Sequence, residues 1–487
     1  MSLAHARILV FVTSAIVLVL EILAGRLLAP YVGVSLETFT GIIGTILAGI
    51  ALGSWLGGIA ADRYPPHRLL GPLIMVGGVF SLLAPTIITV FGPGMQGGRP
   101  LEIVLLTTLG FFIPAVLLSG VTPVVIKIRL QSLEETGAVV GSFSALSTAG
   151  AIVGTFLTGF VLLAAFPSRP IVLVVGGILV AWGLALTITY SALKSTVTGA
   201  LVAGSLLAGG LSVAVTGPCQ FETAYFCARI TVDEFTPSAR ALWLDTLRHS
   251  YVDLDDPTYL EFRYTNLTAD ATRSLGPDGP LDALYIGGGG FTLPRWLSAE
   301  RPGSTNTVLE LDPELVTISE QELGLDPDEI DVIATGDARM TLLDTPLDTF
   351  ELVVGDAFGG PSVPWHLTTQ EFLVEVRDRM SEDGIYVMNV IDYPPHSFAK
   401  AEAATLRSVF DHVMVVAPPA YLEGTGGGNF VLIASNTPLD PDALIAEATA
   451  RGADEAALIG AELDAWIGDA PILVDDFAPV DQLISRP

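Results

Sequence analysis

The stretch Leu284-Tyr285-Ile286-Gly287-Gly288-Gly289-Gly290 decides the fold of this 487-residue chain. A short apolar run, typical of a buried strand, leads directly into four glycines. Glycine accepts the backbone conformations of a tight strand-to-helix turn and lets a ligand approach the backbone closely. A dinucleotide fingerprint would place a further glycine at position 292, where Thr292 stands. The stretch therefore predicts an α/β domain with a ligand site at this turn.

Acidic side chains follow at the ends of the next expected strands. Glu310 comes 23 residues after Gly287, where a carboxylate can accept from both ribose hydroxyls. Asp337, within Gly336-Asp337-Ala338-Arg339, stands where it can accept from an adenine amino group, and Asp356 follows the next strand. Parallel strands bind ligands beyond their carboxyl ends, so these acids are expected in one crevice. The expected strands, separated by helical patterns typical of a parallel sheet covered by helices, are 284–286, 307–311, 330–334, 350–354, 384–390, 412–416 and 430–434.

Residues 1–216 have a different composition and predict a transmembrane helical bundle. Crossing a hydrocarbon layer of about 30 Å needs about 20 apolar residues. Glu21, inside the first run, is the functional candidate of this part because an acid in lipid is costly. Gly49, Gly53 and Gly57 recur every four residues and predict a smooth packing face. Seven runs are long enough to span: 8–30, 38–60, 69–92, 101–126, 138–165, 170–193 and 196–216.

The acidic residues are concentrated after residue 216. Residues 1–216 hold six acids and nine bases, a formal charge of +3, whereas the other 271 residues hold 46 acids and 14 bases, a formal charge of −32. Such a surface repels nucleic acid, which we exclude as a partner. An acidic surface with only three lysines in the chain favours a halophilic, high-salt setting, where screening makes dense like charge tolerable. An acidic protein without a special habitat is the alternative.

The sidedness of the chain is left open by the sequence. Basic residues favour a cytoplasmic N-terminus, so seven crossings would place the acidic part outside. Cys219 and Cys227 are the only cysteines, and they form either a disulfide, as in an oxidising compartment, or two unrelated thiols. The expected binding of a nucleotide-like donor favours a cytoplasmic position for the acidic part instead, because the donor is made in the cytoplasm. If one of the seven runs fails to span, the conflict disappears.

Further stretches accompany the glycine turn in a recognisable order, and with it they are 285–290, 309–313, 336–339, 356–358 with 364–368, 244–245, 249–251, 256–261 and 475–481. On these stretches the chain resembles the spermidine synthases, polyamine aminopropyltransferases, and among them the membrane-bound branch with a transporter-like bundle fused ahead of a spermidine synthase-like domain. The resemblance implies a transmembrane bundle over 1–216, a β-hairpin lead-in and substrate region over 217–280, and a Rossmann-like, methyltransferase-type domain over 281–487.

The resemblance also assigns roles to single residues. Asp356 is the expected catalytic base. The residues expected on the acceptor side are His249, Tyr259 and Trp365. Alternatively, His249 is a surface residue of a hairpin and Trp365 is a packing residue. No metal is expected. The residues expected to bind the donor are Gly287, Gly288, Gly289, Glu310, Asp337 and Ala338.

Two positions depart from the pattern of the soluble aminopropyltransferases. These enzymes have an aspartate where this chain has Gly290, and a second aspartate where it has Gly359. The two acids hold ammonium groups of donor and polyamine, and a close charge pair of this kind contributes on the order of a few kcal/mol. Their loss leaves the fold intact and weakens the selection of a polyamine.

Three functions remain in order of preference. The first is transfer of an aminopropyl group from decarboxylated S-adenosylmethionine to a (poly)amine. The second is methyl transfer from S-adenosylmethionine to a membrane-borne acceptor such as a lipid head group. The third is a non-catalytic polyamine transporter or sensor, although the runs do not resemble a paired-repeat transporter. The expected partners are a small-molecule amine or lipid acceptor, the lipid bilayer of the cell membrane and a second copy in a homodimer.

Overall fold

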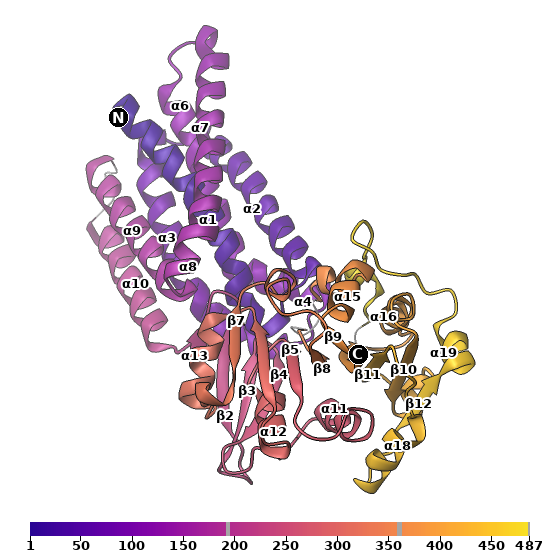
Figure 1. Cartoon of the computed structure of the whole chain (residues 1–487). Coiled ribbons are helices and arrows are strands. Elements are labelled where there is room, and N and C mark those ends of the chain that lie inside the picture. Colours follow the sequence, from indigo (N-terminus) through magenta and orange to yellow (C-terminus); the bar gives the residue numbers. More distant parts are fainter. Residues whose placement is uncertain (191–194, 358–362, 486–487) are drawn as a thin grey trace. The chain divides into compact units, whose positions relative to one another are not determined.

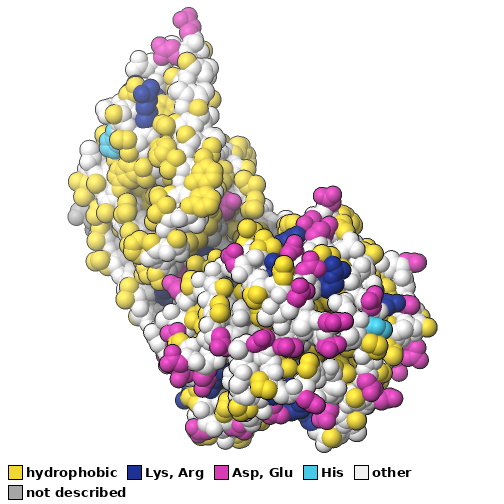
Figure 2. All heavy atoms as spheres, in the orientation of Figure 1, with side chains coloured by type: hydrophobic (Ala, Val, Ile, Leu, Met, Phe, Trp, Pro, Cys, Tyr) yellow, Lys and Arg dark blue, Asp and Glu magenta, His cyan; other side chains and the backbone are white. Residues whose placement is uncertain are grey.

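The computed structural model describes residues 1–190, 195–357 and 363–485, and the chain divides into two compact units, Met1–Ala228 and Arg229–Pro487. Long helices build the first unit (Figure 1), with α3 packed along α9 and α1 along α7. Hydrophobic side chains cover much of its surface, whereas Asp and Glu gather on the second unit (Figure 2). The helices of the first unit are α1 (Leu3–Val32), α2 (Leu36–Arg63), α3 (Pro66–Phe91), α4 (Pro100–Thr107), α5 (Ile113–Ser119), α6 (Val121–Arg129), α7 (Thr136–Leu157), α8 (Leu163–Ala165), α9 (Ser168–Tyr190) and α10 (Ser195–Ala214).

Within the described residues, six helical stretches are long and apolar enough to cross a membrane. They match the first six expected spans, although residues 191–193 of the sixth lie outside the described part. The seventh run forms α10, whose portion Gly199–Ala214 is apolar but shorter than a span, so the seventh crossing stays a prediction. The six stretches are Leu3–Val32, Leu36–Arg63, Pro66–Gly94, Pro100–Arg129, Leu133–Ala165 and Ser168–Tyr190.

The glycine stripe of α2 packs as expected against a neighbouring helix. A methyl group on Gly53 would collide with the backbone carbonyl of Val116 in α5, and one on Gly57 would come within 2.5 Å of the Gly120 carbonyl oxygen. Small residues at these positions let the two backbones approach closely. The stripe is therefore a structural feature of the bundle.

The second unit is organised around an eight-stranded sheet with the order β12-β10-β11-β9-β8-β5-β6-β7. Side chains alternate between its two faces, so that Leu284 packs with Phe372 on one face and Tyr285 packs with Trp296 on the other. The strands are β5 (Asp282–Ile286), β6 (Thr305–Glu310), β7 (Val332–Thr335), β8 (Phe350–Gly355), β9 (Met380–Asp392), β10 (His412–Ala417), β11 (Gly428–Ser435) and β12 (Ala456–Ile459). The helices are α11 (Arg263–Ser274), α12 (Thr292–Glu300), α13 (Pro313–Glu322), α14 (Ala338–Leu342), α15 (Gln370–Arg377), α16 (Ser397–Arg407), α17 (Pro419–Leu422), α18 (Pro441–Ala450), α19 (Gly460–Ile467) and α20 (Val480–Leu483).

The expected parallel sheet is parallel on one side and antiparallel on the other. Strands β7, β6, β5, β8 and β9 are parallel, whereas β11 pairs antiparallel with both β9 and β10, and β12 pairs antiparallel with β10. Residues 418–427 join β10 to β11, and a parallel crossover needs a dozen or more residues. The short connection therefore returns the chain antiparallel.

Residues 217–280, where hairpins were expected, contain four antiparallel strands in the order β1-β2-β3-β4. β3 and β4 are joined by a two-residue turn in which Asp245 has a positive φ of 50°. The strands are β1 (Phe221–Glu222), β2 (Cys227–Val232), β3 (Ala239–Leu244) and β4 (Leu247–Asp253).

Candidate active site

The glycine turn after β5 is held by the carboxylate at the end of β6. The amides of Gly288 and Gly289 donate to Glu310 Oε2 at 2.8 and 3.0 Å, and the Asp312 amide donates to Oε1 at 2.9 Å. Gly287 has a φ of 102°, and a side chain there would collide with the backbone of Asp356. The sequence of this turn is thus dictated by close backbone packing as well as by any ligand.

Asp356 lies directly after β8 and accepts two side-chain hydrogen bonds. Tyr264 of α11 donates its hydroxyl to Oδ2 at 2.8 Å, and Asn389 of β9 donates its amide to Oδ1 at 3.0 Å. Asn429 of β11 in turn donates to Asn389 Oδ1 at 2.8 Å, which fixes the orientation of the Asn389 amide. Burial, and then the charge of Asp356, raise the pKa of Tyr264 well above its usual value, so the hydroxyl stays a donor at neutral pH. These bonds orient the Asp356 carboxylate.

One small cavity joins several of the expected site residues. It has a volume of about 30 Å³ and is lined by Gly287, Gly288 and Gly289, by Asp356 and by His249 of β4. Tyr285 also lines it, and its buried hydroxyl has no hydrogen-bond partner among the described residues. The cavity therefore brings the glycine turn, the expected base and one expected acceptor residue together.

Two expected acceptor residues do not line this cavity. Tyr259 is 44% exposed and donates to Glu261 Oε2 at 2.8 Å, a bond that raises the pKa of Tyr259 to about 12. Trp365 is 47% exposed in the short helix Trp365–Leu367. Their roles at an acceptor stay predictions.

Asp337 and Ala338 begin α14 after β7. Asp337 Oδ1 accepts from the Arg339 amide at 3.0 Å and so caps the helix, while Oδ2 lies 2.8 Å from His366 Nε2. Arg339 forms two hydrogen bonds to Asp475 at 2.7 and 2.6 Å, which raise the pKa of Arg339 and lower that of Asp475. The stretch around Asp475 thus contacts the edge of the expected adenine site. Phe358, and Gly359 where the soluble aminopropyltransferases have their second aspartate, lie outside the described residues.

Comparisons with known proteins show what the chain is similar to. No family profile matches the chain. A polyamine aminopropyltransferase of Vibrio vulnificus is 30% identical over 217 residues, which are 42% of this chain and 70% of that protein. The chain belongs to the polyamine aminopropyltransferase family. An aminopropyltransferase of Neisseria meningitidis is 25% identical over 153 residues, 54% of its length. The crystal structure of a probable spermidine synthase from Corynebacterium glutamicum superposes with a TM-score of 0.50 at 26% identity, covering 56% of this chain and all of that one.

This aminopropyltransferase-family chain has Gly290 where the soluble enzymes have an aspartate, and Ser250 lies close against it. The Gly290 amide donates to Ser250 Oγ at 2.9 Å, and a Cβ atom on Gly290 would lie 2.8 Å from Ser250 Cβ. Strand β4 therefore occupies the space that the first atoms of an aspartate side chain would need. Among the described residues that line the cavity, Asp356 is the only acid.

Sequence reasoning missed Tyr264 and Asn389, the two residues that hold Asp356. Asn389 is an amide inside the apolar run of β9, and a polar residue in a strand buried on both faces is a usable signal. Tyr264 gives no such signal, because it lies at the start of a helix and reaches Asp356 only through the tertiary fold. Among the described residues no group of three or more His, Cys, Asp or Glu side chains could hold a metal ion, and the expected absence of a metal stays a prediction.

Proposed function

We propose that the second unit transfers an aminopropyl group from decarboxylated S-adenosylmethionine to an amine. The observation that carries the proposal is Asp356, a carboxylate oriented by Tyr264 and Asn389 beside the glycine turn of an aminopropyltransferase-family chain. The amine nitrogen attacks the propyl carbon bonded to the sulfonium. The carbon–sulfur bond breaks, and its electron pair neutralises the sulfur to give a thioether. The proton released by the amine goes to Asp356.

Donor binding is proposed to use the residues at the ends of β5, β6 and β7. Glu310 has four lone-pair sites on its carboxylate and uses three for backbone amides, so a ribose hydroxyl competes with or adds to these bonds. Asp337 and Ala338 would contact adenine, with His366 giving up its bond to Asp337 or remaining beside it. His249 is the acceptor-side residue that the cavity supports, and Tyr259 and Trp365 would join it on the outer side.

Methyl transfer from intact S-adenosylmethionine is the second candidate. The observation that favours it is the close contact between Gly290 and Ser250, which leaves no room for the aspartate that the soluble aminopropyltransferases have at this position. The chain also carries apolar helices, which would keep a lipid acceptor and the enzyme in the same membrane. A non-catalytic transporter or sensor ranks last, because the network around Asp356 is of the kind that a base requires.

We also propose a location, a salt condition and an assembly for the protein. The chain would reside in the cell membrane with several crossings, because six of its helices are long and apolar enough. Its acidic second unit would work in high salt, and two copies would form a homodimer. Arg169 at the start of α9 donates to Ser212 at the end of α10, and Arg26 near the end of α1 donates to Thr223. With α10 as a seventh crossing, the second unit would lie on the side opposite the N-terminus.

The mass of the product separates the candidates. Purified full-length protein in high salt is incubated with a diamine or an anionic lipid and with each of the two donors in turn. The proposal expects a diamine product heavier by one aminopropyl group, formed only from the decarboxylated donor. A lipid product heavier by one methyl group, formed from the intact donor, would replace it with the second candidate. A lack of product from either donor despite donor binding would favour a sensor.

A further inference from the structure

A cavity lies at one end of the helical unit, far along the chain from the glycine turn. It has a volume of about 220 Å³ and lies among the last turns of α1 and α3, the first turn of α9 and residues 217–222. All of its lining residues belong to the unit Met1–Ala228. The polar and charged side chains that line it include Arg26, Tyr31, Thr89, Arg169, Gln220 and Glu222.

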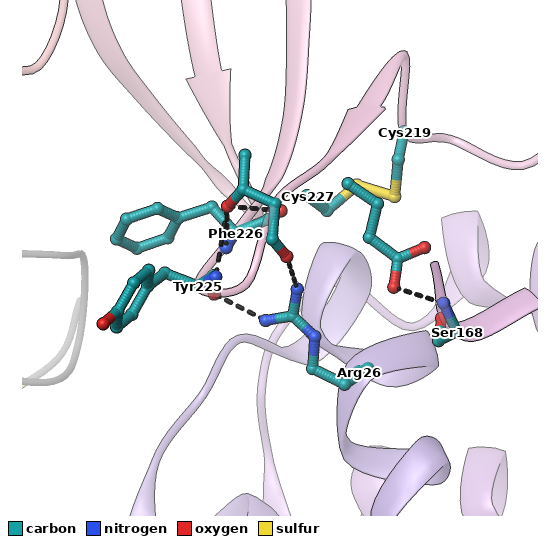
Figure 3. The surroundings of a disulfide bond; sticks show 8 residues. Arg26, Ser168, Cys219, Tyr225, Phe226 and Cys227 are labelled. Atoms are coloured by element: carbon teal, nitrogen blue, oxygen red, sulfur yellow. Dashed lines mark hydrogen bonds between the residues drawn. A yellow bond between two sulfur atoms is a disulfide. The ribbon is translucent and has the colours of Figure 1, made fainter. Parts of the chain in front are cut away.

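The disulfide between Cys219 and Cys227 shapes the wall that faces Arg26 (Figure 3). It closes a short loop, inside which Thr223 Oγ1 accepts from the amides of Tyr225 and Phe226. The carbonyl oxygens of Thr223 and Tyr225 accept from Arg26 at 2.5 and 2.6 Å. The loop and the end of α1 therefore hold the Arg26 guanidinium in a fixed place.

The second guanidinium of the cavity is held in the same way. Arg169 donates from one nitrogen to the carbonyl oxygens of Ser212 and Val215 at the end of α10. Glu222 accepts from the Ser168 amide at 2.8 Å and is the only acid that lines the cavity among the described residues. Two fixed cations and one anion give the wall a formal charge of +1.

The guanidinium groups retain unused hydrogen-bonding capacity. A guanidinium has five N–H donors, and the hydrogen bonds of Arg26 and Arg169 within the described residues use two on each. Arg26 Nε is buried without a partner among these residues. A buried donor without an acceptor is costly, which leaves the Arg26 guanidinium short of acceptors. Guanidinium groups suit phosphate especially well, because their N–H groups can bind two oxygens in parallel.

The remaining walls are apolar and include Leu27, Pro30, Pro85, Ile88 and Pro170. They belong to helices that are long and apolar enough to span a membrane, so the cavity lies where a span ends. We propose that this cavity binds a phosphate group, and that the apolar walls make the head group of an anionic phospholipid its occupant. Basic pockets between membrane helices at the bilayer surface are suited to such head groups.

Lipid titration of the purified full-length chain tests the site. The chain in detergent is titrated with phosphatidylglycerol or phosphatidylcholine, and bound lipid is measured by mass spectrometry. Arg169→Gln is expected to lower the affinity for phosphatidylglycerol about tenfold or more, since it removes a charge-assisted donor. Glu222→Gln keeps an acceptor for the Ser168 amide but removes the negative charge, so the affinity should rise, by about twofold to tenfold. Arg129→Gln is the matched control, because Arg129 ends α6 and does not line the cavity.

Inorganic phosphate distinguishes the two sources of the ligand. Retention of phosphatidylglycerol in excess inorganic phosphate supports a lipid head group, whereas displacement by inorganic phosphate assigns the cavity to free phosphate. Equal binding of phosphatidylglycerol by the wild type, Arg169→Gln and Glu222→Gln would overturn the proposal. The opposite signs expected for the last two variants separate the effect of charge from a general loss of folding. The result does not depend on the transfer reaction of the second unit.

Discussion

Glu310 accepts three backbone hydrogen bonds, so its replacement should affect both the glycine turn and donor binding. Glu310→Ala leaves the amides of Gly288 and Gly289 without their acceptor, at about 1–3 kcal/mol for each buried group. We expect a lower melting temperature and an affinity for the adenosyl thioether product reduced by about tenfold or more. Calorimetric titration and thermal unfolding measure the two effects. Equal thioether binding by wild type and Glu310→Ala would remove the ribose assignment.

Two controls separate these effects at the same turn. Glu310→Gln keeps one acceptor oxygen for the glycine amides and should be closer to wild type in melting temperature than Glu310→Ala. Glu314→Ala removes an exposed acid of the neighbouring helix α13 and should leave both measurements unchanged.

At the scale of the element, the packing of α2 can be tested with two glycines of one helix. Gly53→Ala places a methyl group against the Val116 carbonyl, whereas Gly58→Ala points its methyl group into open space. Alanine is otherwise about 1 kcal/mol better than glycine inside a helix. We therefore expect Gly53→Ala to lower the thermal stability of the detergent-solubilised protein and Gly58→Ala to maintain or raise it. Equal stability of the two variants would contradict the close contact of α2 and α5.

The elements differ in how far the sequence could predict them. The seven strands expected from apolar runs are present, because a buried strand leaves an unbroken run of apolar residues. Strand β12, Ala456–Ile459, was missed because it runs directly into helix α19, so that no turn residues separate the strand from the helical pattern. The direction of β10 and β11 was missed because apolar runs carry no information on pairing. The glycine turn and Asp356 were predicted to lie together, whereas their link to Tyr264 depends on tertiary packing.

The whole molecule combines an apolar helical unit with a strongly acidic remainder. Residues 217–487 carry a formal charge of −32, and this charge repels itself more weakly as salt shortens the screening length from about 10 Å at 0.1 M to about 3 Å at 1 M. We expect the melting temperature of the full-length protein to rise with potassium chloride over this range. Sucrose at matched osmolality is the control for excluded-solute effects. A melting temperature that does not change with salt would contradict the proposed high-salt setting.

The Cys219–Cys227 disulfide can be used to test on which side of the membrane residues 217–487 lie. If residues 217–487 lie outside the cell, an impermeant thiol reagent should label Cys219 and Cys227 on whole cells only after reduction of their disulfide. Labelling that requires lysis, with or without reduction, would place this part in the cytoplasm and favour six crossings. Wild type and the Cys219→Ser, Cys227→Ser double variant form the matched pair for this measurement.

The central claim is amine alkylation with Asp356 as the base, and turnover by Asp356→Asn tests it most directly. Asparagine can still accept from Asn389 and contact Tyr264, so the fold and most of the donor affinity should be retained. The full-length variant is compared with wild type using decarboxylated S-adenosylmethionine and a diamine, with donor binding measured on the same samples. We predict that the rate falls by roughly two to four orders of magnitude, the scale of a general base, while the donor still binds. A rate within about tenfold of wild type would contradict the account, because methyl transfer to an already deprotonated oxygen requires no base.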